Sequence, residues 1–233
     1  MDLTLISVTI MALLVAIAVS IYSWNKLRPL SYLMITWFIL VVGLAQIPYF
    51  EVAGAWQPGD IMGFAVFGNL LSIPIIILLL AWKKSAAFNN FMDATPTWLL
   101  VSTQVYRIVG LVFLIYYFQG KLAFEVGFTS GLMDILVAIS AVIVAWLVYH
   151  KPSREKSLVL AWSIFGLVDF ASAFTITGLS LFGLIQLVPE PSDLGMPPLT
   201  IISIFQVPLA IFIHIYLIAR VRKSSNSQIF NKG

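Results

Sequence analysis

Long apolar stretches dominate the chain, and short segments that hold charged residues, proline or glycine separate them. A transmembrane helix needs about 20 mostly apolar residues, and only helices and closed barrels satisfy their backbone hydrogen bonds in lipid. Barrel strands alternate apolar and polar residues, a pattern that these continuous runs exclude. The sequence therefore predicts an all-α, polytopic membrane protein with seven transmembrane helices. They cover residues 3–24, 30–50, 60–82, 98–118, 125–149, 157–187 and 199–218.

The first and sixth runs depart from a simple span. The run 3–24 opens with Asp2 instead of a basic segment, so we expect it to remain as the first helix and not to be a cleaved signal peptide. The run 157–187 is longer than a bilayer requires. We expect this helix to tilt, or to bend where Gly178 and Gly183 interrupt it.

Basic residues gather in alternate connecting segments, and this bias marks the cytoplasmic side. The N-terminus is therefore expected outside and the C-terminus inside the cell membrane, with residues 1–223 as one transmembrane domain and 224–233 as a short polar tail. The basic residues are Lys26, Arg28, Lys83, Lys84, Lys151, Arg154, Lys156, Arg220, Arg222 and Lys223. The opposite loops hold Glu51, Asp60, Glu125, Glu190 and Asp193, with Lys121 as their only base.

Two segments suggest an internal duplication. "WNKLRPLSYLMITW" (24–37) and "YHKPSREKSLVLAW" (149–162) align without a gap, and the third and seventh helices carry Pro74 and Pro208 in mid-span. A three-plus-one-plus-three arrangement with parallel halves would follow, as in some transporters.

Composition agrees with lipid as the main solvent of the chain. Hydrophobic residues make up 61% and charged residues 10%, and the mean hydropathy is +1.00, which excludes a soluble globular domain. The net charge of +3 is spread over helix ends, so it does not indicate a nucleic-acid partner. The chain has no cysteine, which excludes disulfides and thiolate metal sites.

A layer of polar side chains is predicted in the outer half of the bundle. At 1.5 Å per residue, five helices each place one strongly polar residue about 11 to 18 Å from the outer end. Because an ionisable group inside a membrane costs about 3 kcal/mol, these residues should face inward. They are Asn69, Arg107, Asp134, Asp169 and Gln206, with Gln104 one turn before the arginine.

One arginine faces two aspartates in this layer. The planar guanidinium of Arg107 suits a carboxylate, so we expect it to pair with Asp134 or Asp169. Because one positive charge cannot neutralise two carboxylates, either one carboxyl keeps a proton or a cation or polar ligand completes the site. Ser172 and Thr175 offer hydroxyl partners on the next turn, which favours Asp169 as the protonated group.

The two histidines are weaker candidates for a functional site. His214 is expected deeper than the polar layer, about two turns beyond Gln206. There it would relay protons toward the cytoplasm, or simply bond a backbone carbonyl or extend to the inner interface. His150 lies in a basic loop, and two separated histidines give no case for haem or zinc. The sequence predicts neither a metal nor a cofactor.

Several activities are disfavoured by the residues present. A retinal Schiff base needs a lysine inside the seventh helix, and the run 199–218 has none. "GLMD" (131–134) and "GLVD" (166–169) place two aspartates on neighbouring helices, as intramembrane aspartyl proteases do, but the Gly-x-Gly-Asp signature is missing. No serine elbow, phosphate loop or nucleotide fingerprint is present, so nothing favours an enzyme.

The segment "YRIVGLVFLIYYFQGKLAFEVGFTSGLMDILVAISA" (106–141) resembles a group of bacterial multi-pass membrane proteins that has no assigned function. In that group an arginine-glycine helix precedes a Gly-x-Leu loop and a helix with an aspartate, and "WSIFGLVDFASA" (162–173) fits the helix that follows. The chain departs from the group because Met133, and not glycine, precedes Asp134, and because the loop lacks a proline. The resemblance implies a membrane fold and no particular activity.

These features predict a membrane protein that binds or transports a small polar solute or a proton. The alternatives are a receptor or sensor subunit that binds without transport, and a purely structural hydrogen-bonded clasp between helices. Substrate, partner and oligomeric state do not follow from the sequence.

Overall fold

The computed structural model describes residues 3–45, 61–189 and 194–230, and every regular element in this part of the chain is a helix. The α-helices are α1 (Leu3–Trp24), α2 (Arg28–Leu44), α4 (Ile61–Lys84), α5 (Ala86–Ala94), α6 (Thr97–Ser102), α7 (Leu111–Phe118), α8 (Thr129–His150), α9 (Glu155–Leu181), α10 (Leu199–Ile201) and α11 (Val207–Phe230). The 3₁₀ helices are η1 (Thr103–Gly110) and η3 (Pro152–Arg154), and the π helices are η2 (Phe124–Phe128) and η5 (Ile202–Gln206).

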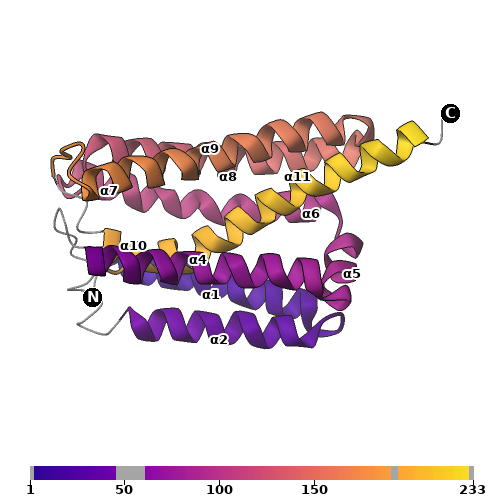
Figure 1. The fold of residues 1–233 in the computed structure, drawn as a ribbon, viewed down its shortest axis with the longest axis horizontal. Coiled ribbons are helices and arrows are strands. Elements are labelled where there is room, and N and C mark those ends of the chain that lie inside the picture. Colours follow the sequence, from indigo (N-terminus) through magenta and orange to yellow (C-terminus); the bar gives the residue numbers. More distant parts are fainter. Residues whose placement is uncertain (1–2, 46–60, 190–193, 231–233) are drawn as a thin grey trace.

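The long helices run alternately in opposite directions along the long axis of the molecule (Figure 1). In the view of Figure 1, α8 and α9 lie on one side and α1, α2 and α4 on the other, while α11 crosses obliquely between the two groups. Accordingly α11 is the most buried of the long apolar helices. It packs mainly on α9 and α4.

Apolar helices of membrane-spanning length account for most of the described chain. Five qualify by length and composition: Leu3–Trp24, Thr97–Phe118, Phe124–His150, Pro152–Ser180 and Leu199–Lys223. A sixth span results if Gly68–Lys84 and Ala86–Ala94, which are bent by 93°, are counted together. Many large apolar side chains point outward from these helices. Such a surface, on helices of this length, indicates association with a membrane.

The helix bounds agree with the sequence prediction for the first run and differ for others. The sixth helix ends at Leu181 and not at residue 187, because Gly183 adopts a left-handed backbone with φ of 70°, which stops the helix. Gly178 remains inside the helix and does not interrupt it. The last helix continues to Phe230, into the segment expected to be a tail. Residues 46–50 of the second run lie outside the described residues.

The short helix α5 was not anticipated from the sequence. Ser85 caps its first turn by accepting a hydrogen bond from the Phe88 amide at 3.2 Å. At its other end, Arg220 of α11 donates to the carbonyl oxygen of Thr95 at 2.6 Å. In addition, the Tyr216 hydroxyl donates to Asp93 at 2.7 Å. These bonds fasten α11 to the end of the bundle at which α5 lies (Figure 1).

Three stretches of non-α helix interrupt the long helices. They are η1 before α7, η2 before α8 and η5 before α11. Proline at position 208 follows η5 closely, and its missing N–H removes one helical hydrogen bond there. Irregular backbone at membrane depth is tolerated only where protein buries it, and π segments often mark functional sites. The side chains on these three stretches are therefore candidates for a functional site.

Candidate functional site

A buried arginine joins two aspartates from neighbouring helices. The Nε of Arg107, on η1, donates to Oδ1 of Asp134, on α8, at 2.7 Å. Its Nη2 donates to Oδ2 of Asp169, on α9. The three residues are only 3%, 8% and 4% exposed. The predicted pairing is confirmed, and it involves both carboxylates together.

His214 is a third partner of the same guanidinium. The Arg107 Nη1 donates to His214 Nε2 at 3.3 Å. Because Nε2 accepts, the neutral ring carries its proton on Nδ1, which has no partner among the described residues. The long Arg107 side chain thus reaches a histidine expected about two turns beyond Gln206.

The face of the guanidinium is also covered. The Phe170 ring lies under Arg107, with 4.2 Å between the guanidinium carbon and the ring centroid. Such a contact stabilises a desolvated cation. Arg107 thus meets two carboxylates, one imidazole and one aromatic face, and it is fixed in position by groups from α8, α9 and α11.

Two glycines allow the helices to approach closely enough for these contacts. A Cβ atom on Gly110 would lie 2.3 Å from the Asp134 Cβ. A Cβ atom on Gly166 would lie 2.4 Å from His214 Nε2 and 3.1 Å from Arg107 Nη1. Small residues at helix interfaces permit such close packing in membrane proteins. The cluster therefore depends on glycine at positions 110 and 166.

Other buried polar side chains lie on the elements that carry the cluster, on η5 and on α10. A 3₁₀ helix aligns residues i and i+3, so Gln104 lies on the same side of η1 as Arg107. The Tyr106 hydroxyl, also on η1, donates to the carbonyl oxygen of Gln206 at 2.9 Å. Within the described part of the chain, several buried polar atoms have no hydrogen-bond partner. These are both amide atoms of Gln104 and of Gln206, and the hydroxyl oxygens of Ser163 and Thr200.

Unpaired polar atoms of this kind are costly in a protein interior, at about 1–3 kcal/mol each. The region accordingly holds more hydrogen-bonding capacity than the described protein atoms use. The second oxygen of each aspartate adds to it, because no other described group bonds to those two atoms. A polar ligand would find both donors and acceptors here.

A cavity of about 70 Å³ reaches both carboxylates. Asp134 and Asp169 line it together with the hydroxyl-bearing residues Ser130, Thr177 and Ser203. Thr177 lies eight residues beyond Asp169 on α9, which is about 12 Å further along the helix. The cavity therefore extends from the aspartates toward the end of the bundle that carries η2 and α10. Its volume exceeds the 10–15 Å³ or so that one water needs.

Not every residue predicted for the polar layer joins the cluster. Asn69 is exposed on α4, and its Nδ2 donates to the Ala65 carbonyl at 2.7 Å. Ser172 and Thr175, expected beside the Asp169 carboxylate, donate instead to backbone carbonyls of their own helix. Short polar side chains in helices often bond the carbonyl one turn earlier. That local bond replaces the expected contacts, whereas Gln104, Arg107, Asp134, Asp169, Gln206 and His214 are all buried.

Sequence reasoning missed two contributors, Tyr106 and Phe170. Each stands next to a residue that was singled out, Arg107 and Asp169 respectively. In an apolar helix an aromatic residue gives no signal of its own, so only the charge beside it pointed to this place. In the described residues no group of three or more metal-ligating side chains is present.

Comparison with known proteins gives one match. A family model described as "Domain of unknown function (DUF8737)" matches residues 64–222. The matched region runs from α4 into α11 and contains the whole Arg107 cluster, while α1 and α2 lie outside it. It also contains the segment 106–141 that resembles multi-pass membrane proteins without an assigned function. No curated protein and no solved structure matches the chain.

Proposed function

Since the chain belongs to the family described as "Domain of unknown function (DUF8737)" and the family region contains the entire ion-pair cluster, we propose a function from that cluster. The chain is a cell-membrane protein that binds, and carries across the membrane, a small polar solute or a proton. The site consists of Arg107, Asp134 and Asp169, with His214 beside them. One observation carries the proposal: the buried arginine lies between two carboxylates that line the same cavity.

Charge balance is the first support. Arg107 brings one positive charge, the two aspartates bring two negative charges when ionised, and His214 is neutral when its Nε2 accepts from Arg107. An unbalanced charge in a low-dielectric interior is costly. The cluster is therefore neutral only when a proton or a cationic group joins the aspartates. Because the two carboxyls share one arginine, that proton belongs to the pair as a unit.

The placement of polar groups is the second support. Hydroxyls from α8, α9 and η5 line the cavity that leads to the aspartates. The amides of Gln104 and Gln206 are buried near the arginine and have no described partner. A closed clasp between helices would use up its hydrogen bonds internally, because unused ones are costly. The surplus favours a site that exchanges a ligand.

The proposed membrane topology has seven spans with the N-terminus outside. It adds α2, whose 17 described residues lie at the short end of the usual range, and α4 to the five long apolar helices. The basic α1–α2 turn, α5 and the end of α11 lie at one end of the molecule (Figure 1), as a cytoplasmic face requires. In this orientation the cavity lies in the outer half of the bundle. The proposal also includes an internal duplication, in which the first three helices of the bundle correspond to the last three.

A receptor or sensor subunit is the second candidate. Tyr216 and Arg220 lie within two turns of His214 on α11, and both bond the segment 92–95 at the end of α5. A change at the cluster would reach the cytoplasmic face through this connection. An intramembrane protease is less favoured, because its two aspartates must share a proton directly, whereas here a guanidinium lies between them.

Thiol accessibility tests the proposal, and the chain suits it because it contains no cysteine. Thr177→Cys places a thiol in the cavity wall, and Ser163→Cys places one on the same helix, outside the cavity and fully buried. Silver ions are small and bind thiolates tightly. Added outside liposomes in chloride-free buffer, they should protect Thr177→Cys from later alkylation in denaturant and leave Ser163→Cys reactive. A thiol at 177 that silver does not reach from outside would overturn the proposal.

A further inference from the structure

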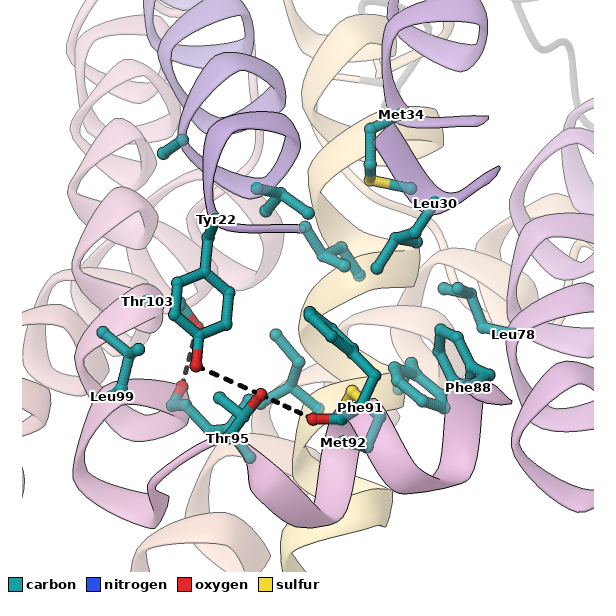
Figure 2. A pocket seen from close by; sticks show the side chains of 16 residues that line it. Tyr22, Leu30, Met34, Leu78, Phe88, Phe91, Met92, Thr95, Leu99 and Thr103 are labelled. Carbon is teal, nitrogen blue, oxygen red and sulfur yellow. Dashed lines mark hydrogen bonds between the residues drawn. The ribbon is translucent and has the colours of Figure 1, made fainter. Parts of the chain in front are cut away.

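An apolar cavity of about 310 Å³ lies next to α5, at the opposite end of the bundle from the cavity at the aspartates. Figure 2 shows side chains from α1, α2, α4, α5 and α6 pointing into it. Its walls are almost entirely hydrocarbon, with Met34, Leu78, Phe91 and Met92 among them, and most of these side chains are buried in the bundle. The cavity shares no lining residue with the cavity at the aspartates.

A second apolar cavity, of about 320 Å³, separates α2 from α4 near Pro74. Leu78 lines both cavities, so they meet at this side chain. The second cavity opens on the outer surface of the bundle, because Leu40 and Ile73 in its wall are more than a third exposed. Together the two cavities form a crevice that leads from the outer surface between α2 and α4 into the bundle.

Apolar space of this size needs an apolar occupant. Protein interiors are packed as densely as organic crystals, and an apolar cavity of about 150 Å³ stays dry and takes up benzene. Each of the two cavities is roughly twice that size. In a bilayer the apolar molecule available at such a surface is the hydrocarbon chain of a lipid, and an elongated crevice suits a chain better than a compact molecule.

Polar groups mark one end of the inner cavity. The Tyr22 hydroxyl lies 3.5 Å from the Thr95 hydroxyl on its wall, as Figure 2 shows. The Lys26 ammonium lies 3.8 Å from the centroid of the Tyr22 ring and is exposed. A cation beside hydroxyls at the end of an apolar cavity complements a lipid phosphate. Lysines at such positions hold their charge at the membrane interface while their stems lie along apolar surface.

We propose that the crevice between α2 and α4 binds one acyl chain of a membrane phospholipid, with the lipid phosphate next to Lys26. The acyl chain begins beside Lys26, runs through the inner cavity past Leu78 and ends between α2 and α4 near Pro74. This site is separate from the ion-pair cluster. It takes from the proposed function only that the bundle lies in a bilayer. A bound chain would fill the space that otherwise separates α2 from α4.

Photo-crosslinking tests the proposal. The full protein is reconstituted with phosphatidylglycerol that carries a diazirine on one acyl chain, close to the glycerol. Phe91 and Met92 are buried, so bulk lipid does not reach them, and their labelling reports a chain inside the cavity. Leu78→Trp and Met34→Trp fill the crevice from two walls, and each should lower this labelling by about tenfold, the effect of excluding about two methylene groups.

Matched controls come from the same structure. Ile76→Trp lies on α4 but outside both cavities and should leave the labelling unchanged. Lys26→Gln should lower the labelling, whereas Lys151→Gln, another exposed lysine at a helix turn, should not. The proposal is overturned if Phe91 and Met92 stay unlabelled while exposed Ile139 and Val142 of α8 are labelled. It is equally overturned if Leu78→Trp, Met34→Trp and Lys26→Gln all label like wild type. Labelled α8 residues would show in either case that the protein is inserted in lipid.

Discussion

At Arg107 a single side chain holds three helices together. Its three nitrogens donate to Asp134, Asp169 and His214, and its flat face lies on Phe170. Only a planar guanidinium with five donors can serve partners in three directions and stack at the same time. A lysine ammonium would lose the stacking and at least one of the directed bonds. The chemistry of the site therefore requires arginine at this position.

Removing the arginine should destabilise the protein strongly. Arg107→Leu leaves two carboxylates buried without a counter-charge, which typically costs about 3–5 kcal/mol. The free energy of unfolding, measured by circular dichroism in mixed micelles, should fall by about this much. Arg222→Leu, an exposed arginine on α11, should change it by less than about 1 kcal/mol.

A double-mutant cycle separates pairing from general damage. The loss caused by Arg107→Leu should shrink when Asp134 and Asp169 are both replaced by Asn, since no buried charge then remains unpaired. Coupling of about 0.5–3 kcal/mol is usual for residues in contact. Strictly additive losses would mean that the guanidinium does not stabilise the aspartates.

Close packing at Gly166 leads to a second prediction. Gly166→Ala would place a Cβ atom 2.4 Å from the His214 ring, so α9 and α11 must move apart and the protein should lose stability. Gly178→Ala is a matched control on the same helix, because no atom lies within 4 Å of the added carbon. It should be neutral or stabilising by about 0.5–1 kcal/mol, the difference between glycine and alanine in a helix. Equal thermal stabilities for the two variants would contradict the packing described here.

At the scale of helices, the sequence predicted the positions of the apolar spans better than the type of helix within them. Apolar runs located α1 and the span that contains α8 closely, because burial in lipid depends on composition alone. The 3₁₀ and π stretches were not predictable, since they result from packing between helices distant in sequence. The short helix α5 was missed because its nine residues are too few and too polar to register as a span.

The same distinction applies to the site. Pairing of Arg107 with an aspartate followed from the cost of intramembrane charge, which any fold must meet. The prediction that Asn69 faces inward was wrong, because its amide forms a hydrogen bond within its own helix and needs no partner in the bundle. The contact of His214 with Arg107 joins residues far apart in the sequence, which no local pattern reports.

The connection between α11 and α5 gives a prediction at this scale. Arg220 bonds carbonyl oxygens at the end of α5, where its charge also interacts favourably with the helix dipole. Arg220→Gln should loosen α5, and amide hydrogen exchange of residues 86–96 should become faster than in wild type. Arg222→Gln should leave these rates unchanged. If the two variants exchange alike, Arg220 does not hold α5 in place.

At the scale of the whole molecule, the two ends of the bundle differ in chemistry. Toward one end lies the cavity that reaches the aspartates and three hydroxyls, and the other end carries basic turns, α5 and the inner apolar cavity. The excess of Lys and Arg predicts that the second end faces the cytoplasm. In that orientation the cavity at the aspartates lies in the outer half of the bundle, which suits a site that is loaded from outside.

Topology is tested by a reporter fused after Gly233. The distribution of Lys and Arg predicts that a cytoplasmic reporter is active there and that an external one is not. Activity only on the external side would reverse the orientation, and the aspartates would then face the cytoplasm.

The central claim is that Arg107, Asp134 and Asp169 form a site that exchanges protons and not a closed clasp. Proton uptake into liposomes that contain a pH-sensitive dye tests it most directly. With an imposed membrane potential, wild type should take up protons, and Asp134→Asn and Asp169→Asn should each abolish uptake, because a single carboxylate paired with Arg107 leaves no charge for a proton to balance. Glu125→Gln, an exposed acidic residue outside the cluster, should behave like wild type. Uptake that is absent in wild type, or that persists unchanged in both asparagine variants, would contradict the claim.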